Sequence, residues 1–161
     1  MHHLASFVVG IFWQGCCFLY MAYFSLFFSA FIAATLLPAS SELLLSGMVV
    51  KQTGLLWLLW LSATLGNVLG SCVNYYLGTQ VDRLSHRRWF PVSPSALEKA
   101  RGHFQKYGTV SLLFAWLPVI GDPLTLVAGV FRIKFGLFLL LVSLGKGLRY
   151  ALVIALALEL F

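Results

Sequence analysis

Two short segments of the sequence repeat one pattern, and each places an acidic residue near a helix-breaking proline inside an apolar stretch. The pattern is Leu37-Pro38-Ala39-Ser40-Ser41-Glu42 and, 80 positions later, Leu117-Pro118-Val119-Ile120-Gly121-Asp122. An ionisable side chain at membrane depth costs about 3 kcal/mol on insertion scales and usually marks a functional site or a structural ion pair. A helix break beside such a residue, once in each half of the chain, is typical of transporters that bind substrate at the membrane midplane.

Two cations lie at the same apparent depth as these acids. Lys146 and Arg149 are three positions apart, so they share one helical face and their charges cancel those of Glu42 and Asp122. One interpretation is two buried ion pairs that fix helix packing. The other is that the cations bind an anionic headgroup, since a guanidinium suits phosphate, while the acids carry protons because apolar surroundings disfavour a charged carboxyl.

The composition is that of a single membrane domain over residues 1–161. The chain is 60% hydrophobic and 10% charged, whereas soluble domains carry about 25% charged residues. Its net charge of +6 is concentrated in residues 79–108, which we expect to form a basic cytoplasmic loop beside anionic lipid. Nucleic-acid binding is the less favoured interpretation of this patch. The basic residues of the loop are Arg83, Arg87, Arg88, Lys99, Arg101 and Lys106.

The residue inventory argues against catalysis and against a metal or cofactor. No histidine accompanies a serine inside an apolar segment, so a serine protease site is missing. The cysteines Cys16, Cys17 and Cys72 have no metal-ligand spacing. Asp122 follows a glycine as in intramembrane aspartyl enzymes, but a second aspartate in an apolar segment is absent. We therefore expect a protein that is not an enzyme and uses no metal or cofactor.

The first half of the chain predicts two spanning helices and one short element. Residues 4–41 carry no charge and are too many for one crossing of about 20 residues. Pro38 splits them into a span ending near residue 36 and a piece over residues 40–50, which is too short to cross and is expected to dip in and return. Residues 55–78 form the next span. Residues 1–20 would be an extra N-terminal helical segment, and Met21 is an alternative start.

The second half of the chain predicts a similar broken element and span, with the opposite orientation in the membrane. A capping-box pattern at residues 95–98 begins a short amphipathic helix that should lie on the membrane surface. Residues 109–131 are long enough to span, but Pro118 and Pro123 interrupt them, and a re-entrant path keeps Arg132 on the side of the basic loop. Residues 135–160 form the last span. The expected fold is therefore all-α, with about three spans, two broken re-entrant elements as an inverted pseudo-repeat, and one surface helix.

Five short motifs together resemble the YqaA-like branch of the DedA family, which is related to SNARE-associated or VTT-domain proteins. The resemblance covers roughly residues 21–155 and implies opposed re-entrant elements, a bacterial inner-membrane location and movement of lipid headgroups, with Glu42 as the acid of the first element. The larger DedA branch has arginines at the positions of Ala115 and Gly121, so Lys146, Arg149 or Arg132 would have to supply the cation here. The motifs are Thr35–Glu42, Gly66–Gly70, Lys106–Gly108, Trp116–Asp122 and Gly145–Tyr150.

These observations predict a transporter that moves a lipid or lipid-phosphate headgroup across the bilayer, with proton linkage as an option. Its substrate ligands would be Lys146, Arg149, Arg132 and Asn67, although Asn67 lies beside a Gly-x-x-x-Gly pattern that more often marks a packing seam. Glu42 and Asp122 would couple protons. The partners would be phospholipid or polyprenyl phosphate, protons and a second copy of the chain. The alternatives are a small-ion or solute transporter and a non-transporting membrane structural protein.

Overall fold

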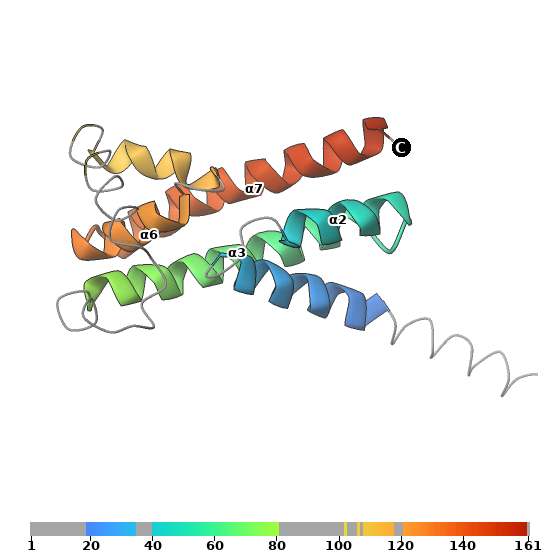
Figure 1. Cartoon of the computed structure of the whole chain (residues 1–161), viewed down its shortest axis with the longest axis horizontal. Helices are drawn as coiled ribbons and strands as arrows, with labels where there is room; N and C mark the ends of the chain where they lie inside the picture. Colours follow the sequence, from blue (N-terminus) through green and yellow to red (C-terminus); the bar gives the residue numbers. More distant parts are fainter. Residues whose placement is uncertain are drawn as a thin grey trace, which may run out of the picture.

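The computed structural model describes residues 19–34, 40–80, 102, 106, 108–117 and 121–160, and these are helical apart from turns and short links. Two long helices form the frame: α3 (Leu56–Thr79) and α7 (Phe135–Leu160). They are antiparallel neighbours along the molecule (Figure 1). With 24 and 26 residues they are about 36 and 39 Å long, which is enough to cross the roughly 30 Å core of a bilayer.

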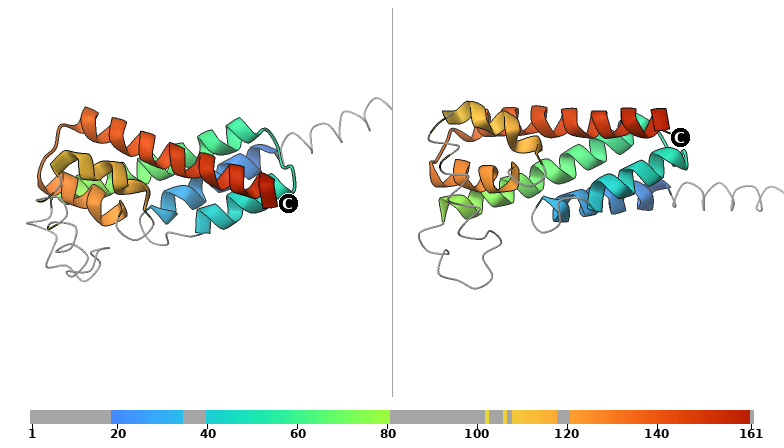
Figure 2. Two further views of the ribbon diagram at one scale, coloured as in Figure 1. Left: turned by 90° about the horizontal axis from the view of Figure 1, so that it is seen from above. Right: turned by 45° about the horizontal axis from the view of Figure 1, so that its top comes forward.

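Two short helices begin at the centre of this frame and run to opposite ends. Helix α2 (Ser40–Val50) starts beside the middle of α7 and leads into the turn before α3. Helix α6 (Gly121–Val130) starts one turn away along α7 and ends at the turn before it. The opposed directions of α2 and α6 are visible in Figures 1 and 2. Their 11 and 10 residues are too few to cross a bilayer.

One further helix accompanies each short helix. The helix Leu19–Ala33 lies against α3 where Gly66 and Gly70 leave room for its backbone, because a Cβ on either glycine would meet the carbonyl oxygen of Phe27 or Phe31. In the other half η1 (Gly108–Trp116) packs against α6 and α7. The described residues between Gly108 and Val130 therefore contain two helices, η1 and α6.

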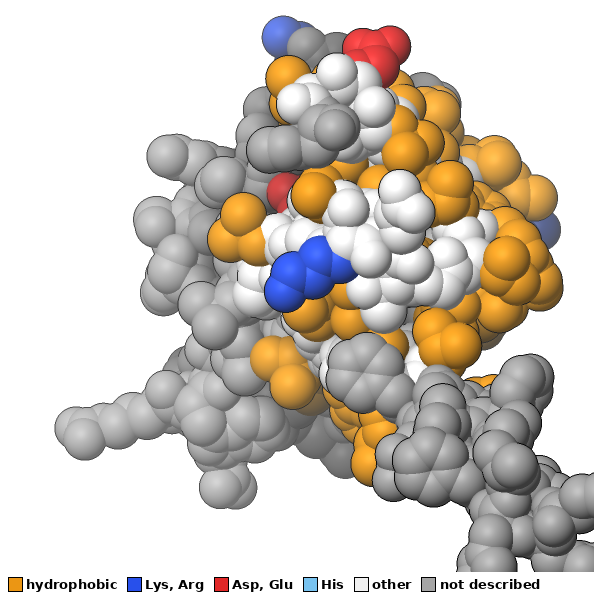
Figure 3. Space-filling model, turned by 90° about the vertical axis from the view of Figure 1, so that its right-hand side faces the viewer, with side chains coloured by type: hydrophobic (Ala, Val, Ile, Leu, Met, Phe, Trp, Pro, Cys, Tyr) orange, Lys and Arg blue, Asp and Glu red, His pale blue; other side chains and the backbone are white. Residues whose placement is uncertain are grey.

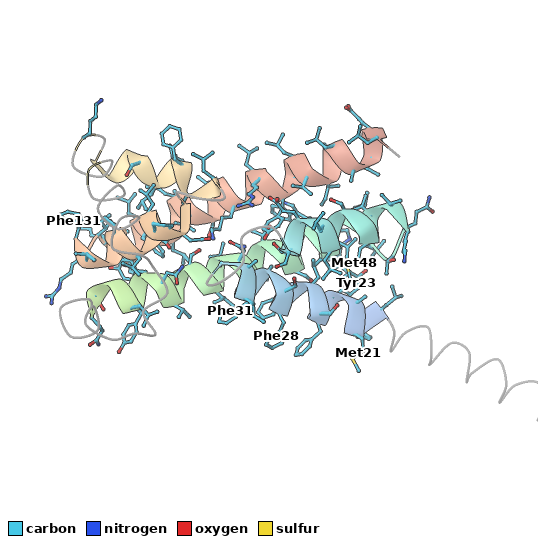
Figure 4. The ribbon with its side chains drawn as sticks, viewed as in Figure 1. Met21, Tyr23, Phe28, Phe31, Met48 and Phe131 are labelled. Carbon is cyan, nitrogen blue, oxygen red and sulfur yellow. The ribbon has the colours of Figure 1, made fainter. Side chains whose placement is uncertain are left out.

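Large apolar side chains cover much of the exterior, whereas the interior contains polar and charged side chains beside two hydrophobic clusters. The α3 residues Leu65, Leu69, Val73 and Tyr76 are exposed, and they recur at the spacing of one helical face. Figure 4 shows Met21, Phe28 and Phe31 on the outer side of the first helix. The polar or charged residues that are buried are Ser41, Thr64, Asn67, Ser71, Asn74, Ser111, Thr125 and Lys146.

The structure confirms some of the expectations from sequence and leaves others untested. The all-helical class is confirmed for the described residues, and two of their helices, α3 and α7, are long and apolar enough to span. The helix Leu19–Ala33 is shorter than the expected first span, so the count of about three spans stays a prediction. Pro38, Pro118, most of the basic loop 79–108, the surface helix and nearly all of segment 1–20 lie outside the described residues.

Candidate functional site

The first acid of the repeated pattern pairs with a cation of α7. Glu42 lies in the first turn of α2, and its Oε1 accepts a hydrogen bond from Nε of Arg149. The Glu42 side chain is 29% exposed, whereas that of Arg149 is 12% exposed. The more accessible member of this pair is therefore the acid.

The second acid pairs with the other cation in the same way. Asp122 lies in the first turn of α6, and its Oδ1 is 3.2 Å from Nζ of Lys146. The Lys146 side chain is 2% exposed and that of Asp122 is 24% exposed. A charge this deeply buried is stable only when it is paired and hydrogen-bonded, and Lys146 also donates to Oδ1 of Asn67.

Asn67 of α3 joins the Asp122–Lys146 pair to Tyr150 and Ser41 in one hydrogen-bonded chain. Its amide nitrogen donates to the carbonyl of Ala30 at 3.1 Å and to the hydroxyl of Tyr150 at 2.9 Å, so both amide hydrogens and the amide oxygen are used. The Tyr150 hydroxyl is in turn 3.0 Å from Oγ of Ser41. The chain runs from Ser41 through Tyr150, Asn67 and Lys146 to Asp122.

Close backbone packing sets the position of α6 along α3. Gly78 of α3 and Gly129 of α6 face each other with their Cα atoms in the way of any added Cβ, so the backbones of the two helices touch there. Pro123 lies in the first turn of α6, where its missing N–H removes no helical hydrogen bond. Pro123 therefore does not interrupt α6, and Asp122 is presented in the first turn of that helix.

Glu42, the acid in α2, lines one wall of an apolar groove. A cavity of about 350 Å³ lies between α2 and α7, with Glu42 as its acidic wall and Ser46 beside it. The rest of the lining is apolar and extends to the C-terminal end of α7. The groove thus joins the charged centre to a surface that suits hydrocarbon. Its apolar walls are Leu43, Val153, Leu156, Ala157 and Leu160.

The structure brings together five of the predicted site residues and separates one. Glu42, Asp122, Asn67, Lys146 and Arg149 meet at the centre. Arg132 is exposed at the turn between α6 and α7, with a left-handed φ of 49°, and α6 separates it from Asp122. Within the described residues no group of His, Cys, Asp and Glu could hold a metal ion.

Sequence reasoning missed Tyr150 and gave Ser41 only a minor role. Tyr150 is four positions after Lys146, so it lies on the same face of α7, and that spacing was the available signal. Ser41 was expected to satisfy backbone groups at the helix break, with lining of the site as the alternative. Its hydroxyl instead bonds to a side chain 109 positions away, a pairing that one sequence does not reveal.

Two apolar helices of spanning length, a buried polar centre and an apolar exterior define a helical integral membrane protein. The chain belongs to the VTT-domain family, also called DedA, because the model of the VTT domain matches residues 37–158. Its relatives include the inner membrane protein YqaA, and it is an inner-membrane protein in turn.

The chain is 43% identical over 137 residues to the inner membrane protein YqaA of Escherichia coli, a match that covers 84% of this chain and 90% of that protein. It is 35% identical over 155 residues to an uncharacterized protein of Haemophilus influenzae, covering 90% of each. A Lactococcus lactis protein described as alkaline phosphatase-like is 29% identical over 136 residues, covering 76% of this chain and 63% of that protein. No solved structure matches the chain.

Proposed function

We propose that this protein moves the phosphate-bearing headgroup of a lipid across the inner membrane, through the centre where α2, α6 and α7 meet. The observation that supports the proposal most is the pairing of both α7 cations with the acids that begin α2 and α6. In this proposal the two short helices are the inner arms of re-entrant elements that enter from opposite sides. Each arm then presents its N-terminal end to the middle of the bilayer.

Electrostatics gives such a centre an affinity for phosphate. The N-terminal turn of a helix offers unpaired N–H groups and a positive dipole end to an anion, and α2 and α6 both begin here. Lys146 and Arg149 add two formal positive charges. A phosphate group would replace the carboxylates as partner of the cations, and protonation of Glu42 or Asp122 would favour this exchange by removing the competing negative charge.

The groove between α2 and α7 favours a lipid over a free solute as the substrate. A headgroup at Glu42 would have its hydrocarbon chain along Leu156 and Leu160, which also line the groove. An anion crossing hydrocarbon unaided pays a large desolvation cost, and a polar centre joined to an apolar groove lowers that cost while the chain stays in an apolar setting. Coupling to protons would follow from the protonation of Glu42 or Asp122 when phosphate replaces the carboxylates. It is a separate proposal.

Lipid movement can be tested in liposomes that contain the purified protein. Dithionite quenching of a fluorescent phospholipid reports its transfer between leaflets, and a labelled polyprenyl phosphate is run in parallel. We expect faster transfer of at least one of these lipids than in protein-free vesicles, and a loss of about ten-fold or more for Arg149→Ala, the factor that corresponds to about 1.4 kcal/mol.

The matched control is Lys134→Ala, which removes an exposed cation at the far end of the molecule and should leave transfer unchanged. Rates equal to protein-free vesicles for both lipids would refute the proposal.

One observation favours a second function, that of a non-transporting membrane protein. Both cations are already paired with acids, and such pairs alone could hold the helices together. The double substitution described in the Discussion distinguishes the two functions, because it separates the stability of the fold from transfer of lipid.

A further inference from the structure

A second groove lies on the other side of α2, away from α7. It has a volume of about 530 Å³ between the first helix and α2, within the size range of ligand pockets. Small residues leave this space: Ala22 and Ser25 on the first helix, and Gly47 on α2. A Cβ added to Gly47 would meet nothing within 4 Å, so the space beside it is open.

The groove changes from apolar to basic along its length. Its inner part is lined by Leu43 and Leu44 of α2, whereas Lys51 and Thr53 line its outer end together with Met21 from the first turn of the first helix. Lys51 is exposed in the turn between α2 and α3. Figure 3 faces this end of the molecule and shows basic side chains as isolated points on a surface that is mostly hydrophobic or uncharged.

The outer end of the groove lies at the level of lipid headgroups. Trp57 is 60% exposed in the first turn of α3, and exposed tryptophans at the ends of spanning helices mark the membrane–water interface. The turn that carries Lys51 directly precedes this position. A cation at that level attracts anionic lipid with about 1 kcal/mol per basic residue, while the apolar part of the groove extends toward the bilayer centre.

We propose that this groove is a binding site for an anionic lipid, with one acyl chain between the first helix and α2 and the headgroup at Lys51 and Thr53. Leu43 is 76% exposed and also lines the groove that contains Glu42, so the bound chain lies next to the charged centre without entering it. The site goes beyond the proposed function because it binds lipid whether or not a headgroup crosses the membrane.

Native mass spectrometry of the full-length protein in detergent tests the site. The probes are dioleoylphosphatidylglycerol and dioleoylphosphatidylcholine, which have the same chains and differ in headgroup charge. We expect the wild type to prefer the anionic lipid by about five-fold, the factor that corresponds to about 1 kcal/mol for one basic residue. Lys51→Gln should abolish this preference and keep the binding of both lipids.

Variants that fill the groove provide a second test of the site. Gly47→Leu places a side chain in the open space and should weaken binding of both lipids by about ten-fold or more, without loss of helix content by circular dichroism because leucine favours helices over glycine. The matched control is Gly136→Leu, at another helical glycine with nothing within 4 Å and at the other end of the molecule. If Gly47→Leu misfolds, Ala22→Leu fills the same groove from the first helix.

Three results would overturn the site. Unchanged lipid binding in the folded groove-filling variant would show that the groove holds no lipid. Equal losses for Gly47→Leu and Gly136→Leu would show unspecific surface lipid. A dimer that the groove-filling variant converts to monomer would assign the groove to a second copy of the chain. Each of these experiments measures lipid binding, so the test of the site does not depend on whether the protein transfers lipid between leaflets.

Discussion

At the scale of single residues, Asn67 is the side chain on which most of the polar centre depends. It contacts the first helix through Ala30 and α7 through Lys146 and Tyr150. Through these two residues of α7 it is linked to Ser41 in α2 and to Asp122 in α6. One amide thus satisfies buried groups from several helices, whereas the side chain of Asn74 makes one hydrogen bond within the described residues, to the carbonyl of Ala34 at 2.8 Å.

This difference predicts unequal costs for two matched substitutions. Asn67→Ala removes the neutral acceptor of a buried ammonium and the donor to Tyr150, and we expect a loss of about 2–3 kcal/mol in the free energy of unfolding. Asn74→Ala removes one bond and should cost about 1 kcal/mol. Denaturation of both variants in detergent, followed by circular dichroism, gives the comparison. An equal or larger loss for Asn74→Ala would contradict the central role of Asn67.

At the scale of elements, the short helices of the two halves, α2 and α6, run in opposite directions. Both α2 and α6 begin with an acid at the centre, and they lead to turns at opposite ends of α3 and α7. The groups at those turns include Lys51 after α2 and Arg132 after α6. If α2 and α6 belong to re-entrant elements, these two cations lie on opposite sides of the membrane.

Cysteine labelling tests this arrangement. Lys51→Cys and Arg132→Cys, each in a chain whose three native cysteines are replaced by serine, should react with a membrane-impermeant maleimide from opposite faces of the inner membrane. Intact spheroplasts expose one face and inverted vesicles expose the other. Labelling of both positions from the same face would exclude the inverted arrangement.

The elements were predicted from sequence better than their contacts were. The charge-free stretches and the prolines predicted α3, α7 and two short pieces, because length and apolar composition limit what crosses a bilayer. The same reasoning assigned Glu42, Asp122, Lys146 and Arg149 to the interior. It did not assign the pairs, because either acid could reach either cation at that level of detail. The pairing depends on where α2 and α6 start along α7, and that is set by helix packing.

At the scale of the whole molecule, the question is whether the four charges serve stability alone. Glu42→Gln leaves Arg149 without its carboxylate, so we expect a loss of about 1–2 kcal/mol in stability, less than for a fully buried pair because the glutamate is partly exposed. Adding Arg149→Gln removes the buried charge, and most of this stability should return. Lipid transfer should be lost in the double variant although it is folded, because the guanidinium that would bind the headgroup is missing.

The measurement combines thermal unfolding in detergent with the dithionite assay on the same preparations. Parallel recovery of stability and of transfer in the double variant would show that the pair is structural. Recovery of stability alone would show that the guanidinium is needed for the activity.

The glycine contact between α3 and α6 makes the two short helices, α6 and α2, mechanically unequal. Gly78 and Gly129 bring two backbones together, and interiors packed this closely do not deform continuously, so we expect α6 to stay in place against α3. Helix α2 has a groove on each flank and is held at its inner end by the contacts of Ser41 and Glu42. We therefore expect α2 to move more readily than α6, and the energy needed to move it to come from the contacts of Ser41 and Glu42 together with the burial of Leu45 and Val49.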